Sequence, residues 1–383
     1  MFKLFSKTSA PAEAKSSATG PLIAFQTQGR AAWSARDTSS MIRTGFEKNP
    51  ICFRAVKMIA EAAAAVPFKI AEGSAVQEVH PVMDLLRNPN AAQSVGEFLE
   101  AFYGQLLLTG DAYIERIGLS ELHVLRSDRM QIIPGPDGWP TAFEYKVGAK
   151  AVRFDVEMGT NPILHMRMFH PSDDHYGLSP LQSAGNALDV HMAASKWSKA
   201  LLDNAARPSG AIVYRGADGM GSLPADQYDR LVSEIESNHQ GARNAGRPML
   251  LEGGLDWKPM GFSPSDMEFQ KTKDAAAREI ALAFGVPPML LGLPGDNTFA
   301  NYAEANRAFY RQTVLPLVQK TASALERWLA ELDSADLSIT ADLDAIPALA
   351  QEREVLWRRV AQADFLSDEE KRKILGLGPK EGA

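Results

Sequence analysis

Two helical patterns joined by a short apolar loop occupy residues 263–332 and constrain the fold more than any other stretch. The first pattern opens with a serine followed by Pro264, which is typical of a helix start because serine caps free amides and proline fits the first helical position. Gly285 and the two prolines after it end this helix. A second helix of about 31 residues, roughly 46 Å long, follows, and Pro316 within it predicts a kink because proline lacks the amide hydrogen. The segment 286–301 between them is apolar, so we expect it to contact another surface.

Length and composition place the chain among folded proteins. With 383 residues and 45% hydrophobic composition, it can bury roughly three quarters of its surface in two or three lobes. We find no apolar run of about 18 residues and no signal-peptide pattern, and we therefore expect a cytoplasmic product with no membrane span. Because the chain has a single cysteine, Cys52, an intramolecular disulfide is excluded. Cys52 lies in a helical pattern, which predicts a buried structural thiol.

The first half of the chain mixes helical and strand patterns, which predicts an α+β fold. Residues 1–25 lack periodicity and are expected to be disordered. Between them and residue 181 the sequence changes from helical periodicity to alternation with turns. The predicted helices are 50–66, 80–86, 94–108 and a long one over 176–206, and the predicted strands are 68–73, 110–116, 122–125, 130–133, 143–147 and 163–168.

The remaining segments predict one small α/β module and a helical end. Within residues 207–262 we expect a strand over 210–214, a helix over 223–237 and a hairpin of strands 249–251 and 255–258. A basic loop there carries Arg243 and Arg247 and is either a solvated turn or a contact for DNA phosphates or a docking partner. After the kinked helix we expect a strand over 337–340, a helix over 344–365 and a last helix opened by a capping box at Ser367.

Several runs resemble, in order, the portal proteins of tailed bacteriophages and of phage-like gene transfer agents. They are His80 to Asn90, Gly110 to Arg116, Tyr176 to Leu181, Arg278 to Gly292 and Asn301 to Glu304, followed by the long helix with a central Leu-Pro. The resemblance implies a mainly helical α+β portal fold with wing, stem, clip and short crown, which forms a ring and is no enzyme. In the family that ring is a dodecamer at one vertex of the capsid, through which double-stranded DNA is packaged and leaves.

Projected onto this chain, the resemblance gives the following domains. They are a disordered arm (1–25), the wing (26–181), stem helix 1 (182–206), the clip (207–262), stem helix 2 (263–285), an apolar loop with the tunnel loop (286–301), a kinked wing helix and strand (302–344) and a short crown (345–383).

The same resemblance implies a mechanical role without a cofactor. The ring would surround the duplex, with the terminase large subunit, a head-tail connector or adaptor protein and the major capsid protein as partners, in the virion at the portal vertex and in the host cytoplasm before assembly. The tunnel loop would present Asn297, Thr298, Phe299 and Asn301 to DNA, although Phe299 could instead tuck into a neighbouring subunit. The net charge of -7 argues against a broad basic face. We therefore expect only isolated phosphate contacts, at Lys271, Lys273, Arg243 or Arg247.

The competing hypothesis is a metal-dependent hydrolase that uses His165, His170 and His175. Five-residue spacing does not place these side chains on one face of a helix or strand, and the sequence has no paired His/Cys spacing and no HExxH. The sequence also lacks a phosphate-binding Gly-x-x-x-x-Gly-Lys-Ser/Thr loop and a nucleophile elbow. A third interpretation is a helical scaffold unrelated to viruses.

Overall fold

The computed structural model of the chain describes residues 24–25, 31–32, 38–72, 75–77, 79–118, 120–156, 161–203, 210–214, 225–238, 255–259, 264–294, 299–330 and 337–377. The chain divides into two compact units, one formed by Met1–Asp189 and Ala281–Ala383 and the other by Val190–Ile280. Among the described residues, none of the helices has the length and apolar character that crossing a bilayer requires.

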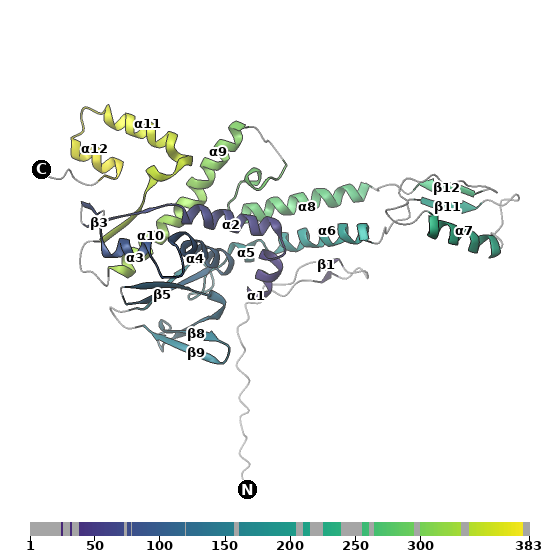
Figure 1. Ribbon diagram of the computed structural model, residues 1–383, viewed down its shortest axis with the longest axis horizontal. Coiled ribbons are helices and arrows are strands. Elements are labelled where there is room, and N and C mark those ends of the chain that lie inside the picture. Colours follow the sequence, from purple (N-terminus) through teal and green to yellow (C-terminus); the bar gives the residue numbers. More distant parts are fainter. Residues whose placement is uncertain are drawn as a thin grey trace, which may run out of the picture. The chain divides into compact units, whose positions relative to one another are not determined.

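The first helices of the first unit lie between residues 38 and 109 (Figure 1), and side chains cap the free amides at the start of three of them. They are α1 (Thr38–Met41), which continues as a π-helical turn (Ile42–Phe46), α2 (Pro50–Ala64), α3 (Pro81–Arg87) and α4 (Val95–Thr109). Asn49 accepts hydrogen bonds from two amides at the start of α2, and His80 accepts one from the amide of Val82. Ser94 forms a capping box at the start of α4. The predicted helix starts are confirmed here, while α1 was not predicted.

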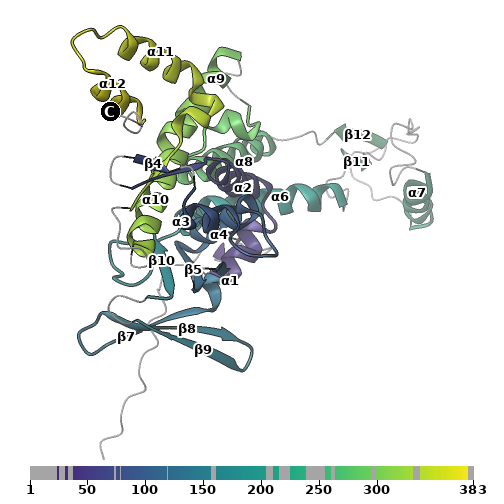
Figure 2. The same cartoon turned by 60° about the vertical axis from the view of Figure 1, so that its left-hand side comes forward.

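Three small antiparallel sheets belong to the first unit, and one of them includes a strand from near the end of the chain (Figure 2). Their strands are β3 (Phe68–Glu72), β4 (Ala75–Gln77) and β13 (Leu337–Ala341) in the order β13-β3-β4, β5 (Asp111–Ile117), β6 (Glu121–Leu125) and β10 (Ile163–Arg167) in the order β10-β5-β6, and β7 (Met130–Pro134), β8 (Pro140–Val147) and β9 (Lys150–Asp155) in sequence order. The sequence did not predict β9, because it is mostly exposed and carries no continuous apolar alternation. The short strands β1 (Ala24–Phe25) and β2 (Ala31–Ala32) pair with each other. β1 occupies the last two residues of the arm (1–25) that was predicted to be disordered, and the other residues of the arm lie outside the described part of the chain.

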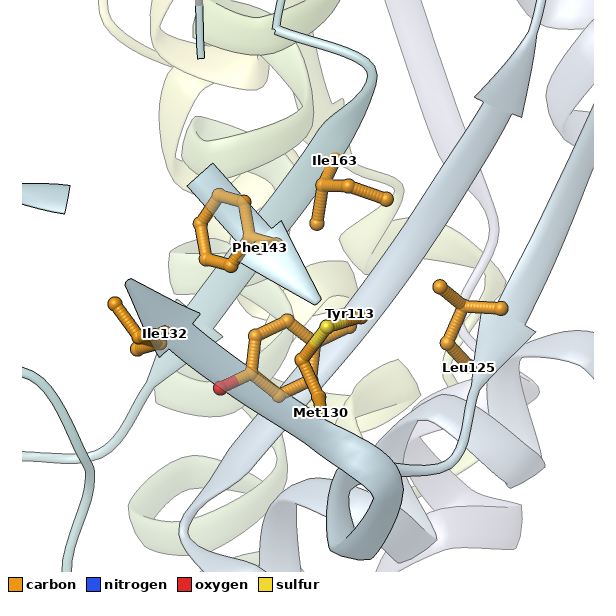
Figure 3. Close-up of a cluster of buried hydrophobic side chains, with 6 residues drawn as sticks. All are labelled: Tyr113, Leu125, Met130, Ile132, Phe143 and Ile163. Atoms are coloured by element: carbon orange, nitrogen blue, oxygen red, sulfur yellow. The ribbon is translucent and has the colours of Figure 1, made fainter. Parts of the chain in front are cut away.

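One apolar cluster joins two of these sheets. Tyr113 from β5, Met130 and Ile132 from β7 and Phe143 from β8 pack together, and Figure 3 shows them with Leu125 and Ile163. The rings of Tyr113 and Phe143 meet edge to face with centroids 6.0 Å apart. This cluster fixes the sheet β7-β8-β9 on the sheet β10-β5-β6.

The long helix predicted after the apolar loop consists of α9 (Phe299–Phe309), a π-helical turn (Tyr310–Val314) and α10 (Leu315–Leu329). It begins at Phe299, three residues before its predicted start at residue 302. Pro316 is the second residue of α10, so the altered hydrogen bonding lies in the turn directly before the proline.

The helix predicted over 344–365 is wrong in its first turns. Pro347 interrupts it, and two 3₁₀ turns (Leu343–Ala345 and Pro347–Leu349) precede α11 (Ala350–Ala361). Ser367 forms the predicted capping box of α12 (Asp368–Leu375).

The second unit lies between two long helices in the sequence. The predicted helix over 176–206 is divided at Ala184 into α5 (Pro180–Ser183) and α6 (Gly185–Asp203), and the unit ends in α8 (Pro264–Ala283). Between them lie β11 (Gly210–Tyr214), α7 (Ala225–Asn238) and β12 (Leu255–Pro259). β12 pairs with β11. The run at 249–251, the other strand of the predicted hairpin, lies outside the described residues, so the hairpin stays a prediction.

Candidate functional site

Two runs that lie far apart in the sequence meet at one junction in the first unit. The carboxylate of Asp111, at the start of β5, accepts the amide of Gly177 at 3.0 and 3.1 Å. The same carboxylate lies 2.8 Å from Nε2 of His165 on β10. The hydroxyl of Tyr176 accepts the amide of Ile132 at 3.0 Å, which ties the segment to β7 as well. This junction anchors the segment 168–179, which leads from β10 to the helices α5 and α6, on two sheets.

Both glycines of the junction are needed for its close backbone contact. Gly110 has a φ of 85°, a left-handed conformation that residues with a Cβ rarely adopt. A Cβ at Gly110 would lie 2.4 Å from the carbonyl oxygen of Gly177, and a Cβ at Gly177 would lie 2.1 Å from the carbonyl oxygen of Gly110. The sequence showed both runs as family-like but gave no sign that they touch.

The three histidines of the hydrolase hypothesis serve three separate local contacts. His165 is stacked on Tyr113 with centroids 4.4 Å apart and bonds to Asp111. His170 accepts the amide of Ser172 through Nδ1, and His175 donates its amide to Asp173. No group of three or more His, Cys, Asp or Glu side chains suited to a metal occurs among the described residues. The hydrolase hypothesis therefore has no support in the described part of the chain.

The apolar loop after α8 is held within the first unit. Gly285, with a φ of 68°, ends the helix, and its carbonyl oxygen accepts the hydroxyl of Thr313 at 2.6 Å. A 3₁₀ turn (Pro288–Leu291) follows, in which Leu290 is buried, and it contacts α2 and α9. The expectation that this apolar segment touches another surface is confirmed.

The predicted tunnel-loop residues are only partly described. Asn297 and Thr298 lie outside the described residues. Phe299 and Asn301 belong to the first turn of α9 and not to a loop, and Asn301 is exposed. Their assignment to a DNA channel stays a prediction.

The basic residues predicted to contact phosphates differ in their exposure to solvent. Lys271 on α8 is exposed, whereas Lys273 is partly buried and its charge lies near His191 on α6. Burial, together with the positive charge of Lys273, lowers the pKa of His191 below its usual value. Arg243 and Arg247 lie outside the described residues. Of the four basic residues, Lys271 is the one that the described structure presents freely to solvent.

This arrangement of mainly helical segments and small sheets is that of a known class of capsid proteins. The chain belongs to the phage portal protein family, whose model matches residues 50–376. The family is a structural, non-enzymatic component of the capsid.

Three relatives show how far the similarity extends. A chain from the neck of an empty gene transfer agent particle, computed with C6 symmetry, is 62% identical, with 92% of this chain and 96% of that chain covered and a TM-score of 0.77. A chain from the neck of a native particle, computed with C12 symmetry, is 61% identical over the same shares, with a TM-score of 0.74. A protein of Rickettsia bellii (strain RML369-C) is 37% identical over 353 residues, which are 90% of this chain and 91% of its own length.

Proposed function

We propose that this chain is the subunit of a closed portal ring of twelve copies at one capsid vertex, and that double-stranded DNA enters and leaves the particle through it. The observation that supports this most is the 61% identity, over 92% of the chain, to a protein in a neck computed with C12 symmetry. Identity of this level over nearly the whole chain preserves packing surfaces as well as the fold. In a closed ring every copy makes the same head-to-tail contact with its neighbour, so that no contact surface is left unpaired.

In this proposal the clip and most of the stem lie in the second unit, and the stem continues into the parts of α6 and α8 that belong to the first unit. Stem helices would span residues 182–206 and 263–285 with the clip at 207–262, the wing would comprise 26–181 and 302–344, and the crown would begin at residue 345. The exposed Lys271 would be a phosphate contact, and the segment 297–301, which ends in the first turn of α9, would face DNA. A channel that passes every sequence needs weak contacts without base recognition, which agrees with the net charge of -7.

The partners follow from this role. The terminase large subunit would supply the ATP-driven force, a head-tail connector or adaptor protein would dock at the clip, and the major capsid protein would surround the ring. Before assembly the subunit would reside in the host cytoplasm and afterwards in the virion.

The experiment that tests the proposal is the assembly state of the purified protein. We expect negative-stain images to show closed rings with a central hole wide enough for a duplex, and native mass spectrometry to show one predominant ring mass. Monomer alone at micromolar concentration and moderate salt would contradict the proposal. Tight binding to one DNA sequence in preference to others would contradict the channel role.

A further inference from the structure

An acidic cavity in the first unit borders the junction of Asp111 and Gly177. Its volume is about 1070 Å³. It is lined by residues of α1, the end of α4, the start of β5, the turn before β7 with the first residue of that strand, the segment 170–178, α5 and the start of α6. Among the described residues that line it are four aspartates and two histidines but neither lysine nor arginine. Because the aspartates are its only acidic or basic side chains apart from the two histidines, such a lining favours a cationic occupant.

Three of the four aspartates already have partners, and one does not. Asp111 bonds to His165 and Gly177, Asp128 is 2.6 Å from a guanidinium nitrogen of Arg126, and Asp173 accepts two backbone amides. Asp174 is exposed and has no hydrogen bond or ion pair within the described part of the chain. Its carboxylate is therefore free to pair with an incoming cation.

Tyr113 provides an independent sign of a missing ligand. The residue is 1% exposed, yet its hydroxyl, drawn in Figure 3, finds no hydrogen-bond partner among the described residues. It lines this cavity. Burial, and then the nearby Asp111 and Tyr176, raise the pKa of Tyr113, so the hydroxyl stays protonated and its oxygen can accept an N–H donor. Buried hydroxyls in folded proteins nearly always have such a partner.

We propose that this cavity receives a basic side chain, arginine or lysine, from the adjacent copy of this chain in the ring. A guanidinium or ammonium group carries several N–H donors and no acceptor, which suits both the free carboxylate of Asp174 and the oxygen of Tyr113. The cavity is far larger than a single ion, and no group of three metal-ligating side chains occurs among the described residues, so a protein segment fits it better than a metal. The inference rests on the proposed ring, in which each subunit always has a neighbour at high effective concentration.

The test compares two variants with two matched controls. Tyr113→Phe removes only the hydroxyl, and Asp174→Asn removes only the charge. Tyr103→Phe removes another buried tyrosine hydroxyl, and Asp364→Asn another exposed carboxylate, and neither of these residues lines the cavity. For each protein, sedimentation velocity at low and high salt gives the subunit concentration at which half of the chains are in rings. The melting temperature under dissociating conditions reports the folding of the single subunit.

We expect Asp174→Asn to raise the half-assembly concentration at low salt by roughly tenfold and to weaken its salt dependence, because a charged contact between subunits is lost. Tyr113→Phe should raise it by about fivefold and leave the melting temperature of the single subunit unchanged or higher, since no bond within that subunit is lost. Both controls should assemble like the wild type.

Other outcomes would overturn the inference in distinguishable ways. If wild-type rings form and both variants assemble with wild-type midpoints, the cavity is merely hydrated and the inference alone fails. If putrescine or Mg²⁺ stabilises the wild type but not Asp174→Asn while ring assembly is unchanged, the occupant is a free cation. If the wild type forms no ring at all, the proposed function fails and this inference fails with it.

Discussion

Replacing Gly177 with alanine should destabilise the first unit strongly, although the added group is a single methyl. The new Cβ would lie 2.1 Å from the carbonyl oxygen of Gly110 and 2.8 Å from the amide nitrogen of Met168. Since ordinary contacts of this kind are about 3.5 Å or longer, the two backbones must separate by more than about 1 Å. That movement breaks the bonds from the Gly177 amide to the Asp111 carboxylate. Overpacking costs about 1–3 kcal/mol and a hydrogen bond to a charged group about 1.5–3 kcal/mol, so we expect a loss of roughly 3–5 kcal/mol in the free energy of unfolding.

The loss should appear as a melting temperature lower by roughly 5–8 °C in differential scanning calorimetry of the purified protein, because the melting entropy of a unit of this size is about 0.6 kcal/mol/K. Gly104→Ala is the matched control, because Gly104 lies inside α4 and a Cβ there would meet nothing within 4 Å. That change should stabilise the helix by about 0.5–1 kcal/mol. A Gly177→Ala protein that melts within about 1 °C of the wild type would show that the junction does not hold the segment in place.

Four further predictions concern other parts of the chain. Phe299→Ala should leave ring assembly and the melting temperature near those of the wild type and reduce the DNA retained per particle; a large stability loss with normal packaging would place Phe299 in a core instead. Burial raises the pKa of the Cys52 thiol to about 12, so a thiol reagent such as DTNB should label the folded protein only at the rate of unfolding. The pKa of His191 is lowered in the folded state, so its contribution to stability is fully present above a pH of about 6.5 and is lost as the pH falls toward the folded pKa. The melting temperature should therefore fall between neutral and mildly acidic pH, and His191→Gln should make that decrease smaller. Lys271→Gln should lower DNA retention most at low salt, whereas a loss independent of salt would contradict a phosphate contact.

Local signals in the sequence predicted the helix ends well, because capping depends on neighbours within three residues. Asn49, Ser94 and Ser367 each accept the amides that their positions require, and Pro264 and Gly285 mark the ends of their helix as expected. The errors arise where a nearby residue competes with the pattern. Pro347 stops a helix whose apolar spacing runs on past it.

Contacts between distant segments could not be predicted in this way. The sequence predicted strands at 210–214 and 255–258 but did not predict that they pair, and β12 pairs with β11 across the whole of α7. In a long insertion, several strands compete for each edge, and side-chain packing decides among them. The meeting of Gly110 and Gly177 is of the same kind, since glycine in a single sequence does not show which backbone approaches it.

The residues of the candidate site are hard to predict from the sequence, because in a ring a site can be formed by residues of more than one copy. In Lys271 and Lys273 the sequence shows two equal charges two residues apart on one helix. The structure separates them, because that spacing turns the second side chain by about 200° around the helix axis and brings its charge near His191 on α6. The same reasoning applies to Tyr113 and Asp174. In the sequence they are an ordinary aromatic residue in a strand and an ordinary carboxylate in a loop, and nothing indicates that either lacks a partner. Only the folded subunit shows that one has a buried hydroxyl without a partner and the other a free charge at the same cavity. A buried hydroxyl without a partner and a free carboxylate at one cavity are the reason for proposing that a basic side chain of the neighbouring copy binds there, because natural folds rarely leave such groups unpaired.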